Sequence, residues 1–430
     1  MRIVLIVPGT GDAFYCQNCQ RDLGLVAALR RHGHDALVVP LYLPLTAGGR
    51  QAGGADVFYG AVSLYLRHQH PRLARVLPAG FWRLLDARPV LHAAARLARS
   101  TRASGLGALT VSMLQGEQGR QAAELDRLVT WLASDPAARP DVIVLSNALL
   151  LGLGRRLRAE LRVPVVCWLQ DEHVWVDALP PPEAARTWQV LRERAADASA
   201  FLAVSAAYAD RMADALGVDR RRIHPVHPGV EPSAYRPADV RRRPRAVGFL
   251  SRLAAGEGFD RFVEAFLELR RDPRFADVRL HATGGLSGDR RFLPRQRRRL
   301  ARAGLAGAAA IAPFAFHRDR AGFLAGLTLL SVPVPGGEAF GTYVIEAMAA
   351  GVPVVEPDTG AYPEIFRTAG CGTPSAGADA AGLARTWAAL LEDPLRLESE
   401  ARLGREAVAR HFNLDRMAAE TAACLSEVTP

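Results

Sequence analysis

Two glutamates and a run of glycines in the second half of the chain have the types and spacing to bind a phosphate and a polyol. They lie in the stretch Pro335-Gly-Gly-Glu-Ala-Phe-Gly-Thr-Tyr-Val-Ile-Glu346. The glycine-rich turn follows an apolar run, and a helix beginning near Gly341 or Thr342 directs its positive N-terminus at this turn. Glu338 lies on the turn, and Glu346 lies about one helical turn into the helix, four residues after Thr342. One carboxylate can therefore accept hydrogen bonds from a polyol beside a bound phosphate, and the other from a second diol.

The elements that must position these residues alternate between strand-like apolar runs and helical patterns, which predicts an α/β fold with mostly parallel strands. A Gly/Pro/Arg stretch at 235–245 separates two halves of similar size, each Rossmann-like in its pattern. A helical insertion over about 70–134 interrupts the first half. Ligands of open parallel sheets bind at the carboxyl ends of the strands, so a cleft between the two domains is the expected site. The expected strands are Arg2–Val7, Asp35–Leu41, Asp141–Ser146, Val163–Leu169, Ala200–Ser205, Ile223–His227, Ala246–Leu250, Val278–Thr283, Ala309–Pro313, Thr328–Val334 and Val352–Glu356.

The composition excludes several kinds of chemistry. All 54 basic residues among the 430 are arginine, and the net charge is +10. Codon bias in a GC-rich genome explains the missing lysine, but its absence still excludes Schiff-base catalysis and a P-loop. Arginines, backbone amides or helix N-termini must therefore hold any anion. The arginines are scattered without interleaved aromatics, so no nucleic-acid partner is expected.

The Glu338–Glu346 segment resembles the E-x7-E pattern of retaining GT-B glycosyltransferases, in particular family 4. The likeness runs through Gly336–Val355 and continues in Thr359-Gly360 and Pro363-Glu-Ile365. Further matching segments are His227-Pro-Gly-Val-Glu231, Ser251-Arg-Leu253 and Gly258-Phe259. The resemblance implies a GT-B fold, with an acceptor domain over 1–238 and a donor domain over 239–412. It also implies that a C-terminal helix, 413–430, crosses back to the first domain.

By this resemblance, Glu346 should bind the ribose of a nucleotide sugar and Glu338 should contact the donor sugar. Gly337 and Glu257 should also lie at the donor, the amides of Phe340, Gly341 and Thr342 should bind the diphosphate, and Arg252 should neutralise its developing charge. The implied reaction is transfer with retention of configuration to a small or lipid-linked acceptor. The nucleotide sugar is a co-substrate and no other cofactor is expected. The chain contains no Asp-x-Asp, so no metal site is expected either.

Two positions depart from the family pattern. Glu257 occupies the position where the family has a lysine in the donor loop, and a carboxylate beside a diphosphate is unfavourable. Gln170 occupies a strand end where many relatives have a histidine, and His173 follows three residues later. Gln170 or His173 could act at the reacting sugar, although a loop histidine without function is an equal alternative. A nucleotide-sugar-binding protein with impaired transferase activity is therefore a second hypothesis.

The first strand is followed by Gly9-Thr-Gly-Asp12, which in a GT-B protein lines the acceptor side of the cleft. Cys16 and Cys19 come directly after it. They are either small side chains at a helix start, a redox or metal pair, or part of an enzyme whose nucleophile is a thiol or an inorganic anion.

No apolar run approaches the length of a membrane span, and the N-terminal run is too short for a signal peptide, which predicts a cytoplasmic protein. The arginine-rich stretch 71–102 is read as a solvated helical face, with peripheral contact to anionic lipid as the alternative. The residues identify neither the sugar, the base nor the acceptor.

Overall fold

The computed structural model describes residues 1–9, 17–42, 46–47, 50–51, 106–134, 139–286, 288–315, 319–377 and 379–429. The chain divides into two compact units. The first contains Met1–His227 and Met417–Pro430, and the second contains Pro228–Arg416. Each unit is an α/β layer structure with parallel strands, as the sequence predicts. A cleft between them stays a prediction.

The first unit is built on a parallel sheet with the strand order β2-β1-β5-β6-β7-β8. Strands β1, β5, β6 and β7 are buried almost throughout, which fits their continuous runs of apolar residues. The strands are β1 (Arg2–Val7), β2 (Asp35–Pro40), β5 (Val142–Leu145), β6 (Val165–Leu169), β7 (Ala200–Ala203) and β8 (Ile223–Pro225). A separate antiparallel pair consists of β3 (Thr46–Ala47) and β4 (Arg50–Gln51).

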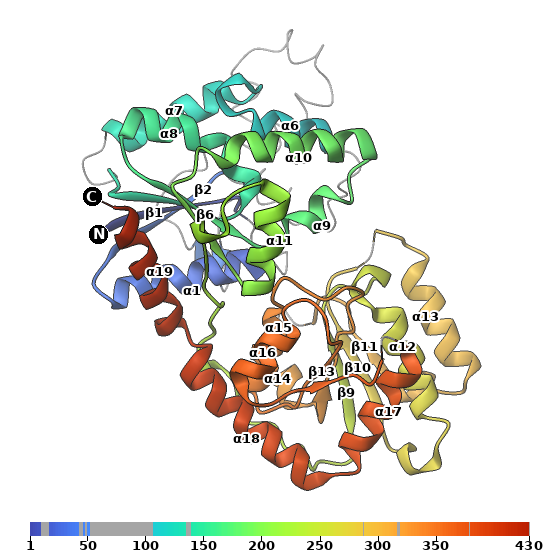
Figure 1. Cartoon of the computed structure of the whole chain (residues 1–430). Coiled ribbons are helices and arrows are strands. Elements are labelled where there is room, and N and C mark those ends of the chain that lie inside the picture. Colours follow the sequence, from blue (N-terminus) through green and yellow to red (C-terminus); the bar gives the residue numbers. More distant parts are fainter. Residues whose placement is uncertain are drawn as a thin grey trace. The chain divides into compact units, whose positions relative to one another are not determined.

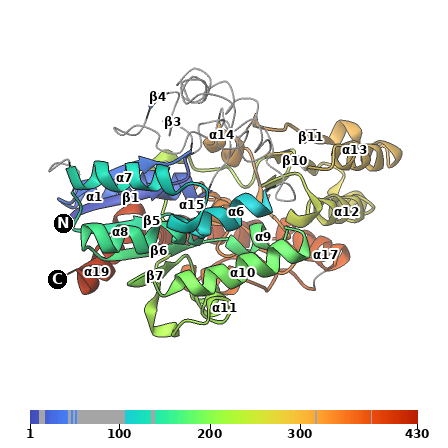
Figure 2. The same ribbon diagram turned by 90° about the horizontal axis from the view of Figure 1, so that it is seen from above.

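Helices cover both faces of this sheet, with α7 and α8 on one face and α1 on the other (Figure 1). Helices α10 and α11 lie side by side near β7 (Figure 2). The helices are α1 (Gln17–Arg31), α6 (Gly107–Leu114), α7 (Ala122–Ser134), α8 (Gly154–Leu161), α9 (Glu172–Val176), α10 (Pro181–Ala195), α11 (Ala206–Leu216) and α19 (Leu414–Val428).

The second unit has the sheet β11-β10-β9-β12, and a bridge between Leu330 and Val354 continues it to the β13–β14 pair. In chain order within the unit this is 3-2-1-4-5-6, the strand order of the Rossmann fold. The strands are β9 (Ala246–Leu250), β10 (Arg279–Thr283), β11 (Ala309–Ile311), β12 (Leu329–Leu330), β13 (Val355–Glu356) and β14 (Thr373–Pro374). The helices are α12 (Phe259–Leu269), α13 (Phe292–Arg302), α14 (Arg320–Ala325), α15 (Thr342–Ala349), α16 (Tyr362–Ala369), α17 (Ala380–Leu391) and α18 (Pro394–His411).

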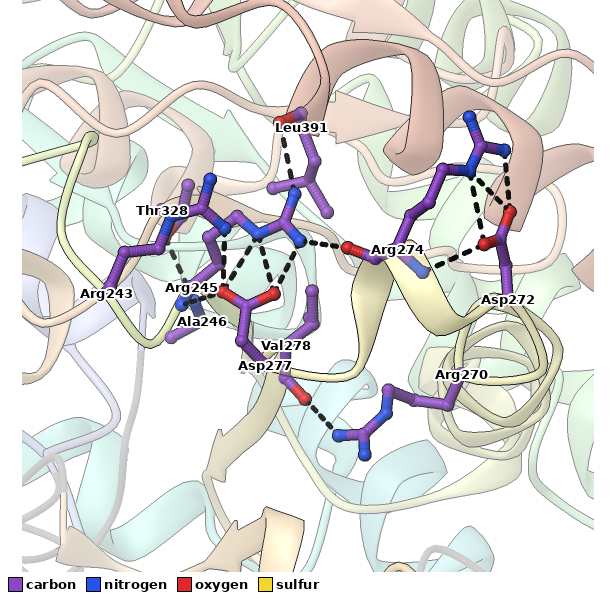
Figure 3. Close-up of polar contacts among 10 residues, drawn as sticks. All are labelled: Arg243, Arg245, Ala246, Arg270, Asp272, Arg274, Asp277, Val278, Thr328 and Leu391. Carbon is purple, nitrogen blue, oxygen red and sulfur yellow. Dashed lines mark hydrogen bonds and ion pairs between the residues drawn. The ribbon is translucent and has the colours of Figure 1, made fainter.

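Arginine–aspartate contacts tie together the amino-terminal edge of the second sheet (Figure 3). Asp277, just before β10, accepts hydrogen bonds from Arg245, just before β9, and from Arg243. The hydrogen bonds from Arg245 and Arg243 hold the pKa of Asp277 well below its usual range. Thr328 accepts from the Ala246 amide at the same edge. These contacts link the segments that lead into β9, β10 and β12, and the loops that follow the strands lie at the opposite edge of the sheet.

No helix within the described residues is both long enough and apolar enough to span a membrane.

Candidate functional site

The site in the second unit lies at the carboxyl edge of its sheet, where β9 and β12 are neighbours. These are the first and fourth strands of the unit, and between them the strand order reverses. Ligands of such sheets bind outside the carboxyl ends at this reversal. The loop with Arg252 and Glu257 follows β9, and the glycine-rich turn with Glu338 follows β12. The two segments that were predicted to bind the donor therefore lie at the same edge of the sheet.

Glycines allow the loops at this edge to pack backbone against backbone. A Cβ built on any of three glycines would lie within 2.6 Å of another loop's backbone, which is too close for any side chain. The close approaches are Gly258 to the Pro333 oxygen at 2.0 Å, Gly284 to the Ser251 oxygen at 1.6 Å and Gly337 to the Gly360 nitrogen at 2.6 Å. The loops after β9, β10, β12 and β13 therefore form one interlocked surface.

Glu346 lies on α15 and is buried, with an exposed fraction of 2%. Its Oε1 accepts from Arg320 Nη1 at 2.5 Å and from the Tyr235 hydroxyl at 3.0 Å. Its Oε2 is buried and has no hydrogen-bond partner within the part of the chain that the structure describes. A buried acceptor without a donor costs about 1–3 kcal/mol. The carboxylate therefore has one oxygen fixed by the protein and one that a bound donor would satisfy.

Glu338 is half-buried on the turn before α15. Its carboxylate accepts from the Tyr343 hydroxyl at 3.2 Å, and the hydroxyls of Tyr343 and Tyr362 are 2.5 Å apart. Burial, and then the nearby carboxylates, raise the pKa of both tyrosines well above the usual value, so both hydroxyls remain donors. The Ala361 amide also donates to the Glu338 carbonyl oxygen at 3.0 Å. These contacts hold the turn and orient the carboxylate.

Helix α15 begins after Gly341, whose φ is +78°, and no described side chain caps it. Phe340, Gly341 and Thr342 are all buried at this start. The predicted phosphate-binding turn is thus followed directly by a helix N-terminus, as expected.

Arg252 is engaged by the residue that replaces the family's lysine. Its Nε and Nη2 donate to Glu257 Oε1 at 2.9 and 2.5 Å, and Ser251 donates to Oε2 at 3.1 Å. The arginine side chain is 59% exposed and the glutamate side chain 12%. The Arg252 guanidinium, which was expected to neutralise phosphate charge, is therefore already paired with a carboxylate.

In the first unit, Gln170 follows β6 at the carboxyl edge and is 2% exposed. Its Oε1 accepts from Arg21 Nη1 at 2.8 Å. Arg21 also forms an ion pair with Asp22 at 2.6 Å, and the hydroxyl of Ser146 donates to Asp22. Sequence reasoning found Gln170 but not this pair, because α1 residues 149 positions away carry no local signal of the contact.

His173 lies on α9, the short helix that follows the same strand. Glu172 accepts from the amides of Ala148 and Gln170 and from the Tyr208 hydroxyl. Since Tyr208 donates to Glu172, its oxygen is left to accept from His173 Nδ1 at 3.2 Å. This assigns His173 the Nδ1–H tautomer, with Nε2 as an acceptor. Burial, with nearby Arg211, lowers the pKa of His173 to about 4, so the ring is neutral near pH 7.

The predicted acceptor loop is described only at Gly9, whose φ is +79°. Thr10, Gly11, Asp12 and Cys16 lie outside the described residues, as do 71–102 in the helical insertion. Cys19 is buried in α1. Within the described ranges, no group of three or more His, Cys, Asp and Glu side chains could hold a metal ion.

Two segments of the chain match known protein families. Residues 108–234 match the family described as Glycosyltransferase Family 4. Residues 244–393 match the family described as Glycosyl transferases group 1. The two matches fall on the two units in this order.

Several curated proteins that are similar in sequence to this chain are described as D-inositol 3-phosphate glycosyltransferases. D-inositol 3-phosphate glycosyltransferase 1 of Catenulispora acidiphila is 30% identical over 55% of this chain and 60% of its own length. D-inositol 3-phosphate glycosyltransferase of Mycobacterium tuberculosis is 32% identical over 45% of this chain and 41% of its own. The chain thus spans roughly half the length of the relatives it matches.

Solved structures resemble the chain over nearly its whole length. Anabaena HepE in complex with UDP aligns with a TM-score of 0.67 and 18% identity, covering 99% of this chain and 100% of that one. Sucrose-phosphate synthase from Thermosynechococcus elongatus aligns with a TM-score of 0.66 and 16% identity, covering 99% of both chains. At such identities these likenesses establish the fold.

Proposed function

Because this chain is a GT-B protein that resembles glycosyltransferase family 4, we propose that it transfers a sugar from a nucleotide diphosphate donor to a small or lipid-linked acceptor. The proposed transfer retains the anomeric configuration and uses no metal ion. The expected site in the second unit takes the donor.

The observation that carries this proposal is the buried Oε2 of Glu346, which lacks a donor among the described residues. Oε1 is already saturated by Arg320 and Tyr235, so the carboxylate is held in place without a ligand. A ribose diol offers the hydroxyl donors that Oε2 needs. The complexes of HepE with UDP and UDP-glucose support a nucleotide sugar as this ligand.

The proposed mechanism gives the protein a stabilising and positioning role. The acceptor oxygen forms a bond to the anomeric carbon as the bond from that carbon to the diphosphate breaks. The leaving diphosphate takes the acceptor's proton, so atoms and charge balance. Glu338 stabilises positive charge on the sugar, and the turn before α15 stabilises negative charge on the phosphate. No side chain is required as a base.

A thermal-shift screen of UDP, GDP, ADP and dTDP and their glucose conjugates tests the proposal. We expect one base to raise the melting temperature, because a ligand that binds only the native state stabilises it in proportion to its concentration over Kd. An unchanged melting temperature at millimolar concentrations of all eight compounds would contradict a nucleotide-sugar site.

The Arg252–Glu257 pair favours a second candidate function, a nucleotide-sugar-binding protein with impaired transferase activity. Glu257→Gln removes the carboxylate and releases Arg252 for a charge-assisted bond to phosphate. We expect UDP to bind about tenfold more tightly, since such bonds contribute about 1.5–3 kcal/mol. Isothermal titration calorimetry measures this directly.

Glu264→Gln is the matched control, since Glu264 is an exposed carboxylate of the same unit that pairs with Arg299 at 3.5 Å. It should leave UDP affinity unchanged. Equal or weaker binding by the Glu257 variant would show that the carboxylate belongs to the competent donor loop, and would count against the second candidate function.

A further inference from the structure

A stripe of arginines runs along the exposed side of α13 (Phe292–Arg302) in the second unit. In both views this helix lies at the outer rim of that unit, beside α12 (Figure 1, Figure 2). Phe292, Gln296 and Leu300 recur every four residues and are buried. The exposed arginines have spacings of four, three and four residues, which places them on one other face of a helix with 3.6 residues per turn. The arginine stripe consists of Arg291, Arg295, Arg298 and Arg302.

Few carboxylates neutralise the arginine stripe. Residues 288–308 contain seven arginines and one acidic residue, Asp289, which gives this segment a formal net charge of +6. Asp289 pairs with Arg295 at 2.9 Å in the first half of the stripe. In the second half, Arg298 and Arg302 have no carboxylate partner among the residues that the structure describes. This half therefore carries uncompensated positive charge.

The abundance of arginine in the chain does not by itself explain such a face. On α8, in the first unit, two exposed arginines each have a carboxylate partner. Arg155 pairs with Asp197 at 3.3 Å, and Arg156 pairs with Asp126 at 3.2 Å. The second half of the arginine stripe differs from such a face because its guanidinium groups remain available to an anionic partner.

An apolar groove of about 430 Å³ lies beside the stripe, between α13 and the edge strand β11. Its lining combines apolar side chains, among them Leu300, Ala306 and Ile311, with Arg297 and Arg298. Arg297 Nη2 donates to the Ile311 carbonyl oxygen at 3.1 Å, which ties α13 to β11. Arg298 belongs to both the groove and the stripe. The face therefore offers a partner positive charge and apolar surface side by side.

This combination matches the surface of an anionic bilayer. Anionic headgroups attract basic side chains, and the acyl boundary beneath them takes up apolar surface. A single-stranded nucleic acid is instead bound by aromatic side chains interleaved with arginines. The one aromatic residue of α13, Phe292, is buried.

We propose that the arginine stripe and the adjoining groove, together the α13 face, dock on a bilayer that contains anionic phospholipid. The surface is separate from the stretch 71–102, which the sequence suggested as an alternative lipid contact. No residue of the donor site takes part, so the inference goes beyond the proposed function and does not depend on it.

Vesicle co-sedimentation of the full chain tests this docking. Each arginine at an anionic surface contributes roughly fivefold, so the four should strengthen partitioning onto phosphatidylglycerol–phosphatidylcholine vesicles about 10²–10³-fold over pure phosphatidylcholine vesicles. Raising the salt from about 0.1 M to 1 M should abolish this difference, since the Debye length falls from about 10 Å to 3 Å. Equal partitioning onto the two kinds of vesicle, or onto neither, would overturn the proposal.

Arg298→Gln/Arg302→Gln removes the uncompensated half of the stripe and should weaken partitioning onto the anionic vesicles about 25-fold. Arg298→Lys/Arg302→Lys keeps both charges and should partition like the wild type. The matched control is Arg402→Gln/Arg410→Gln, which removes the same charge from exposed positions on α18 of the same unit. It should also partition like the wild type. Circular dichroism checks that each variant folds, and Arg298→Gln alone should still weaken partitioning about fivefold.

Two results with these variants would contradict docking by the α13 face. Equal losses in the α13 and α18 glutamine variants would mean that net charge controls partitioning. Wild-type partitioning of the α13 glutamine variant would assign the lipid contact to another part of the chain, such as 71–102. Ala306→Gln tests the groove, and should weaken partitioning about fourfold, the effect of one methyl group withheld from lipid. An unchanged value would overturn the part assigned to the groove.

Other occupants of the α13 face are distinguished by competition. Millimolar sn-glycerol 3-phosphate should leave the protein on the vesicles, since a single headgroup contacts only part of the stripe. Its release would indicate a pocket for one soluble phosphate and overturn the bilayer proposal. A DNA duplex that bound the wild type more tightly than the vesicles, and lost this affinity in Arg298→Gln/Arg302→Gln, would identify a nucleic-acid surface instead.

Discussion

Replacing Glu338 with alanine is expected to lower kcat by about 10²–10³-fold, while KM for the nucleotide sugar changes little. A carboxylate aimed at charge that develops in the transition state contributes on this scale, because its environment is already organised. Glu338 has such an environment: Tyr343 donates to it, and the turn is fixed by the Ala361 amide. Steady-state UDP release measures both parameters.

Tyr343→Phe is the control for this prediction. It removes one 3.2 Å hydrogen bond to Glu338 but leaves the carboxylate and the buried ring in place. Its effect should be about tenfold or less. If Glu338→Ala raised KM alone, Glu338 would bind the ground state and the transition state equally, and the proposed charge stabilisation would be wrong.

Replacing Glu346 with glutamine is expected to weaken UDP binding by about ten- to a hundredfold. Arg320 and Tyr235 donate to one oxygen, so they select the amide oxygen of the variant for that position. The NH2 group then lies where Oε2 was, and an acceptor becomes a donor. Loss of a hydrogen bond to a charged group costs about 1.5–3 kcal/mol. Calorimetric titration with UDP gives the value.

Tyr235→Phe separates the two oxygens of this carboxylate. It removes a donor to Oε1 and leaves Oε2 unchanged, so UDP affinity should fall by much less than in Glu346→Gln. Equal losses in both variants would mean that the orientation of Glu346, rather than its Oε2 acceptor, controls binding.

Local patterns were sufficient to predict the parallel strands, and also the glycine-rich turn that leads into α15. Strands β1 and β9 have the predicted bounds, since apolar runs enclosed by polar or glycine residues leave little choice. The strand expected at Thr328–Val334 is only Leu329–Leu330. The reason is a side chain: the Val332 amide donates to the Glu356 carboxylate rather than to a neighbouring strand.

The partners of the site residues could not be predicted in this way. Arg320 lies on α14 and Tyr235 in the stretch before β9, and neither belongs to a motif. They reach Glu346 only because the unit folds around α15. Arg21 and Asp22 in α1 reach the end of β6 for the same reason. The sequence showed a negative charge at Glu257 where the family pattern has a positive one. It did not show the hydrogen bond from Arg252, because that bond depends on the conformation of the loop.

The interlocked glycines of the second unit limit how the loops at the carboxyl edge of its sheet can change. At Gly258, Gly284 and Gly337 an added methyl group would overlap the backbone of another loop. A saturation library at these codons should therefore return glycine almost exclusively, whatever sugar is selected for. Adaptive changes must therefore come from side chains that protrude from these loops, such as that of Glu257, which is one of the two positions that depart from the family pattern. We therefore expect variants with an altered ligand preference to exchange charges on these loops rather than to reshape them.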